Sequence, residues 1–254
     1  MPQTDTSITV RTSMPADPAS LGTLAAAVAE AGGTVESVRT VAAGAEHTRE
    51  LRVRIRDLAH GEAVAAAIAE LTGHTLHDTR SAGVAAREGG VLAMRTSIPV
   101  TTRDDLAMAY TPGVARVCMA IHHDFDQAWT YTIKANSVMV VSDGSDVPGC
   151  GKVSAEASLP ACESVALSLR DGAGIDAFPL PVDAESVDEI VNTIAKCSSV
   201  FAGVHLTAMA ADRAAAVQQG LQAVIDIPVK VGGEDSATFA SDWRTAIDAA
   251  RPAA

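Results

Sequence analysis

Alternating apolar and polar residues predict a small sheet with two helices over the first eighty residues. The four strand-like stretches are residues 7–12, 34–41, 48–55 and 75–79. Asp17 and Pro18 open an apolar stripe at helical spacing, and residues 61–71 carry a second one. The predicted order of elements is βαββαβ, which is typical of a ferredoxin-like domain.

After a glycine-containing stretch, the pattern changes to apolar strand-like runs that alternate with longer helical ones. The strand-like runs are residues 137–141, 174–182, 199–206 and 225–229, and the helical ones are 101–106, 114–122, 163–169, 186–197, 210–221 and 242–250. Such alternation predicts an α/β fold. We therefore expect two domains, residues 1–82 and 83–254, with residues 81–95 as the linker and the first strand of the second domain.

Composition and charge restrict the classes of partner. The formal net charge of −12 and the pI of about 4.9 argue against a nucleic-acid partner, which needs a basic face. No apolar run approaches the roughly eighteen residues that a membrane span requires. Four scattered cysteines without a C-x-x-C pair are typical of reduced thiols in a cytoplasmic protein.

One stretch stands out chemically. Tyr110-Thr111-Pro112-Gly113 places a phenol beside a sharp turn, because proline fixes φ and glycine permits positive φ. Lys134 follows and leads into an apolar strand that ends at Asp143-Gly144. Open α/β sheets place their ligands at this carboxyl end of the strands.

Residues 104–118 resemble the opening signature of the amino-terminal domain of malic enzymes, and residues 173–179 and 187–191 match it too. The chain resembles especially the bacterial NAD-dependent type that carries an ACT domain in front. The resemblance implies that residues 1–82 are ACT-like and pair into a homodimer. An amino-acid effector at the loop Pro15 to Gly22 is one possibility, and dimerisation without an effector is the other.

The resemblance also implies roles that this sequence fills only in part. Tyr110 takes the place of the family's general acid. Val165 stands where the family has a lysine base, and valine can neither accept nor donate a proton. Thr207, Ala208 and Gly233 stand where carboxylates hold a divalent metal, so we expect no metal site.

No G-x-G-x-x-G motif follows residue 206, and too few residues remain for a dinucleotide-binding domain. We therefore expect no cofactor. The leading hypothesis is a malic-enzyme-related protein that has lost malate oxidation and acts as a small-carboxylate-binding or regulatory protein. A related hypothesis makes it a small-molecule sensor that works through the ACT-like domain.

The retained residues of the family pattern are the candidate substrate-binding groups: Lys134, Asp143, Gly144 and Glu163. Turn geometry and a structural role for Lys134 are the alternative explanation. Lys152 departs from the family pattern, and the resemblance implies that it lies in the loop that faces the family's active site. With Tyr110 it would form an acid–base pair for a cofactor-independent lyase, decarboxylase or isomerase, and the alternative is a surface lysine.

Overall fold

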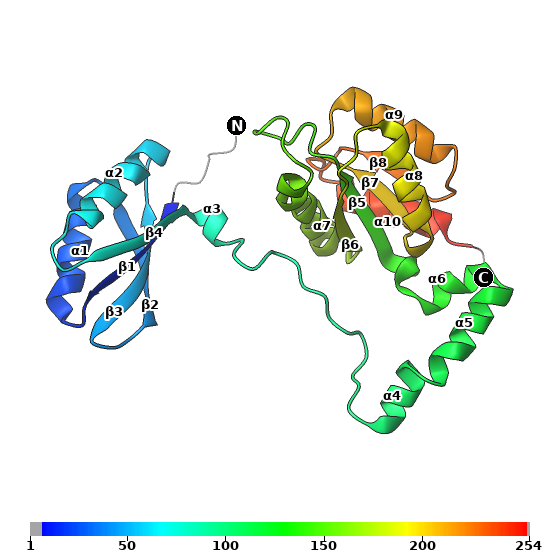
Figure 1. Cartoon of the computed structure of the whole chain (residues 1–254), viewed down its shortest axis with the longest axis horizontal. Helices are drawn as coiled ribbons and strands as arrows, with labels where there is room; N and C mark the ends of the chain where they lie inside the picture. The colour runs from blue at the N-terminus through cyan, green and yellow to red at the C-terminus, as the bar shows by residue number, and fades with distance from the viewer. Residues whose placement is uncertain (1–6, 253–254) are drawn as a thin grey trace. The chain divides into compact units, whose positions relative to one another are not determined.

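The computed structural model describes residues 7–252, and the chain divides into two compact units, Met1–Gly90 and Val91–Ala254. Figure 1 shows the elements of both units along the chain. Each unit has a four-stranded sheet of its own, antiparallel in the first unit and parallel in the second. The mixed α/β class predicted from the sequence is confirmed.

The first unit follows the predicted βαββαβ order. Its elements are β1 (Ser7–Pro15), α1 (Pro18–Glu30), β2 (Thr34–Ala42), β3 (Glu46–Arg54), α2 (Leu58–Ala69), β4 (Thr75–Ser81) and the short α3 (Ala82–Ala85). The antiparallel sheet has the order β2-β3-β1-β4. Alternate residues of β1, including Ile8, Val10 and Met14, are buried in a core shared with Leu24 and Val28 of α1. The assignment to the ACT family stays a prediction.

The ends of the two helices in this unit follow from local hydrogen bonds. The Asp17 side chain accepts from the backbone N–H of Ser20 at 2.9 Å, which starts α1 where the sequence predicted it. The second helix begins at Leu58 and not at Gly61. The Asp57 side chain accepts from the backbone N–H of His60 at 2.8 Å, so an unrecognised cap adds almost one turn.

The second unit holds the parallel sheet β6-β5-β7-β8. Its strands are β5 (Ser137–Ser142), β6 (Asp176–Pro181), β7 (Gly203–Leu206) and β8 (Val229–Val231). Its longer helices are α4 (Arg103–Ala109), α5 (Gly113–His123), α7 (Leu159–Ala173), α8 (Val187–Cys197), α9 (Ala211–Gln222) and α10 (Phe239–Ala250). Short helical turns complete it: η1 (Phe125–Gln127), α6 (Ala128–Tyr131), η2 (Ile133–Asn136), η3 (Glu156–Ser158) and η4 (Ser198–Val200).

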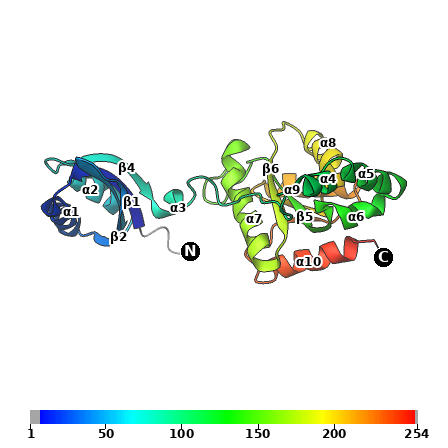
Figure 2. The same ribbon diagram turned by 90° about the horizontal axis from the view of Figure 1, so that it is seen from below.

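Helices cover both faces of this sheet, because successive side chains of a strand point to opposite faces. Met139 and Val141 of β5 pack in one cluster with α8 and α9. Val138 and Val140 pack in another with α7 and α10. Figure 2 shows α8 and α10 on opposite sides of β5 and β6. Every residue of β5 is buried, as a central parallel strand requires.

Two strand predictions for this unit are wrong. Residues 81–95 contain no first strand of the sheet: α3 occupies residues 82–85, and Gly89 and Gly90 adopt φ of 86° and 79°, outside the strand region. The predicted strand at residues 225–229 lies further on, at β8. Pro228 has no N–H to donate to a ladder, so regular pairing begins at Val229.

Length and apolar character together decide whether a helix can cross a bilayer. Within residues 7–252, no helix combines the length and the apolar character that crossing requires.

Candidate functional site

A cavity of about 520 Å³ lies at the carboxyl edge of the parallel sheet. Its wall combines the last residues of β7 and β8 and the loops after β5, β7 and β8 with residues of α7 and α9. The lining residues are Asp146, Val147, Pro148, Ala161, Ser164, Val165, Leu206, Thr207, Ala208, Met209, Ala214, Val231, Gly232, Glu234 and Asp235. This is the edge at which open α/β sheets bind ligands.

Of the five positions at which the resemblance locates a catalytic or metal-binding group, Val165, Thr207 and Ala208 line this cavity, whereas Tyr110 and Gly233 do not. Val165 is buried on α7 and lines the wall. Thr207 and Ala208 line it directly after β7, where the Thr207 N–H donates to the Val141 carbonyl at 2.9 Å. Ala208 has a positive φ of 49°, a sign of a sharp turn at this point. The wall therefore offers an isopropyl, a hydroxyl and a methyl group.

The side chains of this wall do not fit the divalent metal that the resemblance implies. Mg²⁺ and Mn²⁺ prefer several carboxylate oxygens, and Thr207 and Ala208 supply none. Within residues 7–252, no group of three or more His, Cys, Asp and Glu side chains is arranged to hold a metal ion. The carboxylates that do line the cavity belong to Asp146, in the loop after β5, and to Glu234 and Asp235, in the loop after β8.

Glu234 is the most firmly held of the acidic side chains in the wall. His205 is fully buried on β7, its ring packs edge-on against Phe239 and Trp243, and its Nε2 lies 2.8 Å from Oε1 of Glu234. Burial by itself raises the pKa of Glu234, but the hydrogen bonds from His205, the backbone and Thr207 lower it to about 2. Glu234 is therefore a carboxylate at physiological pH.

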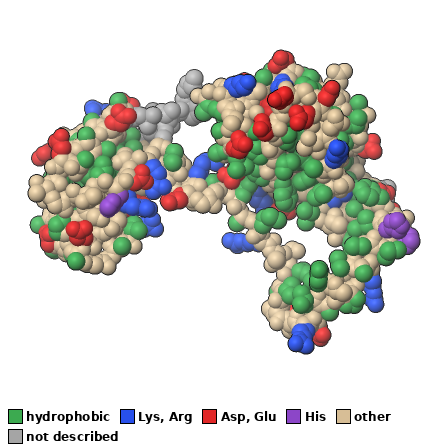
Figure 3. All heavy atoms as spheres, in the orientation of Figure 1, with side chains coloured by type: hydrophobic (Ala, Val, Ile, Leu, Met, Phe, Trp, Pro, Cys, Tyr) green, Lys and Arg blue, Asp and Glu red, His purple; other side chains and the backbone are tan. Residues whose placement is uncertain are grey.

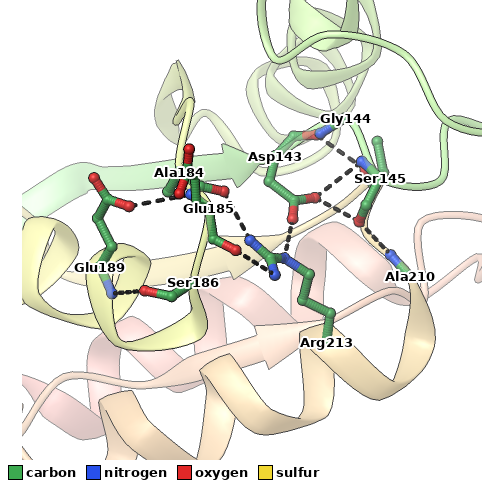
Figure 4. Close-up of polar contacts among 11 residues, drawn as sticks. Asp143, Gly144, Ser145, Ala184, Glu185, Ser186, Glu189, Ala210 and Arg213 are labelled. Carbon is green, nitrogen blue, oxygen red and sulfur yellow. Dashed lines mark hydrogen bonds and ion pairs between the residues drawn. The ribbon is translucent and has the colours of Figure 1, made fainter.

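Asp143, which the sequence predicts to bind substrate, is engaged in a structural ion pair. Its carboxylate oxygen Oδ2 accepts a hydrogen bond from Nε of Arg213, a residue of α9. The side chain of Asp143 is 4% exposed and that of Arg213 is 24% exposed. Figure 4 shows that the guanidinium also reaches the loop after β6, where it donates to the carbonyl of Ala184 at 2.8 Å.

The remaining oxygen of Asp143 fixes its own loop. Oδ1 accepts from the backbone N–H of Ser145 at 3.0 Å and from its hydroxyl at 2.6 Å. The Ser145 hydroxyl in turn accepts from the N–H of Ala210 at 2.9 Å. The Asp143 carboxylate thus joins the ends of β5 and β6 to the start of α9, and it does not line the cavity.

The backbone conformation at Gly144 explains why this residue is glycine. Its φ is 73°, and a Cβ at this position would lie 2.6 Å from the Ser154 carbonyl oxygen. The backbone of residues 153–154 runs against it, and the Val153 N–H donates to the Gly144 carbonyl at 2.8 Å. Glycine is therefore required here for the loop geometry.

Lys134 is buried at the amino end of β5, whereas the cavity lies at the carboxyl edge of the sheet. Its Nζ donates to the carbonyls of Phe201 at 2.8 Å and Ser199 at 3.2 Å, and it lies 5.1 Å from the ring centre of Trp129. Burial lowers the pKa of Lys134, and no carboxylate is among these contacts. Its ammonium links η2 to the turn before β7.

The structure does not bring the proposed acid–base pair together in this cavity. Tyr110 ends α4 with 66% of its surface exposed, and Lys152 is exposed in the loop after β5. Neither residue lines the cavity. Glu163 is half-buried on α7, next to the lining residues Ser164 and Val165, and is itself outside the wall.

Sequence reasoning missed Arg213 and Asp146. The partners of Arg213 lie 28 to 70 residues away along the chain, so no local motif could connect them. Asp146 follows the Asp-Gly turn of β5 by only two residues, and its position at the carboxyl end of a strand was the available signal.

Fold and cavity together define an α/β protein with a ligand-sized cavity at the carboxyl edge of a parallel sheet. Residues 92–186 match the family model described as malic enzyme, N-terminal domain. The chain is 34% identical over 223 residues to the NAD-dependent malic enzyme of Geobacillus stearothermophilus, covering 87% of this chain and 47% of that protein. It is 31% identical over 241 residues to NAD-dependent malic enzyme 1 of Bacillus subtilis, covering 94% and 55%.

A solved structure agrees with these sequence relatives. The NAD-dependent malic enzyme from Thermotoga maritima superposes with a TM-score of 0.56 at 31% identity, covering 59% of this chain and 42% of that one. The chain is thus homologous to bacterial malic enzymes. It spans about half the length of the two curated relatives it matches.

Proposed function

We propose that this malic-enzyme-related chain does not oxidise malate and acts as a binding or regulatory protein for a small molecule. One observation carries the proposal. A cavity lies at the carboxyl edge of the sheet, but Val165, Thr207 and Ala208 form its wall where the family resemblance implies a base and metal-binding carboxylates. The cavity favours ligand binding, and these three side chains disfavour the proton transfer and metal binding that the resemblance implies.

We expect the purified chain, supplied with malate, Mn²⁺ and NAD or NADP, to reduce no nucleotide above the rate of a heat-inactivated sample. Val165 cannot take the proton that leaves the malate hydroxyl, and Thr207 and Ala208 supply no carboxylate pair for the metal. Absorbance of the reduced nucleotide at saturating malate measures this directly. Malate-dependent reduction by the native chain would contradict the proposal.

We also propose a homodimer, with its interface in the second unit and not in residues 1–82, where the family resemblance implies it. Exposed large hydrophobic side chains gather in one segment of the second unit: Met94, Ile98, Val100, Leu106, Met108, Tyr110, Val114, Met119, Phe125, Tyr131 and Ile133. Neither α4 nor α5 has a buried residue. Figure 3 shows hydrophobic side chains gathered along this region. A second copy that covers the segment would remove this apolar surface from water.

We expect sedimentation to give a mass of twice the 26.0 kDa of the chain, and the double substitution Met108→Glu and Met119→Glu to give the single mass. Two charges in a covered apolar surface would be desolvated without partners. Val224→Glu, at a residue that is 60% exposed outside the segment, is the matched control and should remain dimeric. A native monomer, or a dimer unaffected by both glutamates, would argue against this interface.

A further inference from the structure

The charges of the cavity wall are all of one sign. Asp146 follows β5, and Glu234 and Asp235 follow β8, so carboxylates approach the cavity from two loops. No Lys or Arg is among the residues that line it. A carboxylate ligand would meet like charges without a cationic partner, whereas a cation would be attracted by them.

The carboxylate of Glu234 is held in a fixed position in the wall by a hydrogen bond. Its Oε1 is held by the Nε2 of the fully buried His205, and its side chain is still 30% exposed. One carboxylate oxygen is therefore fixed by a buried residue, while part of the Glu234 side chain stays accessible to a ligand. The Thr207 hydroxyl also hydrogen-bonds to Glu234, which orients the carboxylate further.

The rest of the wall is mostly apolar. Val165, Leu206 and Met209 are buried and contribute hydrocarbon surface, and the hydroxyls of Ser164 and Thr207 are the uncharged polar groups. At about 520 Å³ the cavity lies within the range of small-molecule sites, roughly 300–1,000 Å³. A bare metal ion would leave this apolar surface without a partner, and within residues 7–252 no three acidic, histidine or cysteine side chains are arranged around one point to hold it.

We propose that the cavity binds a small organic cation: an aliphatic amine whose ammonium group is paired with Glu234 and whose hydrocarbon part packs on Val165, Leu206 and Met209. Asp235 and Asp146 add negative charge to the same wall. This inference rests on the proposed function, because it assigns a ligand class to the same cavity. The small carboxylic acid that the sequence analysis expects as the ligand becomes the competing hypothesis.

Isothermal titration of the full chain with 1,4-diaminobutane, n-butylamine, succinate, malate and Mn²⁺ tests the assignment. We expect at least one amine to bind saturably with a stoichiometry of one per chain, and neither dicarboxylate to bind. Glu234→Gln combined with Asp235→Asn should weaken the amine at least tenfold. The side-chain amide oxygen that Glu234→Gln introduces can still accept from His205, and a melting curve of the variant checks that the fold persists.

Asp248→Asn removes an exposed acid of the same unit outside the cavity and is the matched control for non-specific attraction; it should leave amine binding unchanged. Amine binding that is insensitive to the double variant, saturable binding of succinate or malate, stoichiometric binding of Mn²⁺ alone, or no binding by any probe would each overturn the amine assignment. Malate bound but not oxidised would overturn only this assignment, whereas malate oxidised would overturn the proposed function.

Discussion

Replacing Arg213 by alanine is expected to destabilise the chain by about 3–5 kcal/mol, because it leaves the carboxylate of Asp143 buried without its cationic partner. Only 4% of that side chain is exposed, and the guanidinium also satisfies the carbonyl of Ala184. Urea unfolding followed by far-ultraviolet circular dichroism measures the change.

Two further variants separate the charge from the shape of the arginine. Arg213→Lys keeps the charge but cannot reach the carboxylate and the carbonyl with a planar fork, so it should lose less stability than alanine and more than a surface substitution. The Arg213→Ala, Asp143→Asn double variant should recover part of the loss, because the amide needs no counter-charge. An alanine variant as stable as the native chain would refute the structural role of this pair.

Replacing Trp243 by alanine is expected to lower the free energy of unfolding by about 3–5 kcal/mol, because it removes a fully buried aromatic side chain. Trp243 fixes α10 on the sheet: a Cβ on Gly203 of β7 would lie 2.4 Å from its ring, and the ring of His205 packs edge-on at 5.9 Å. The same urea unfolding experiment measures the loss.

Trp243→Phe is the control for this prediction. It keeps an aromatic ring on the Gly203 surface and removes an indole N–H that has no hydrogen-bond partner, so it should lose clearly less stability than alanine. Equal losses for phenylalanine and alanine would show that the ring contacts with β7 and His205 contribute little.

Local patterns predicted most elements of the fold from the sequence. Asp17 with Pro18 and Ser186 with its early acids mark helix starts that the structure confirms, because caps act within three or four residues. The run Val138 to Val141 predicted a buried strand, and its burial on both faces confirms it. Errors arose where a cap was overlooked, at Asp57, and where proline displaced a strand, at Pro228.

The candidate site depended on contacts that a sequence cannot display. The cavity was predictable as a location, because carboxyl ends of parallel strands meet at one edge. Which side chains meet there was not. His205 and Glu234 are 29 residues apart, and Asp143 and Arg213 are 70 residues apart. Tyr110 remains a functional candidate from the resemblance alone, and Lys152 from its departure from the family pattern.

Binding of Mn²⁺, followed by electron paramagnetic resonance of the free ion, tests most directly whether the ancestral metal site has been lost. We expect no saturable binding to the native chain in the micromolar range, and saturable binding after Thr207→Glu with Ala208→Asp. Aspartate suits the positive φ at residue 208 better than most residues, so the variant restores the carboxylate pair with little backbone strain. Stoichiometric micromolar binding by the native chain, abolished by Glu234→Gln with Asp235→Asn, would contradict the account.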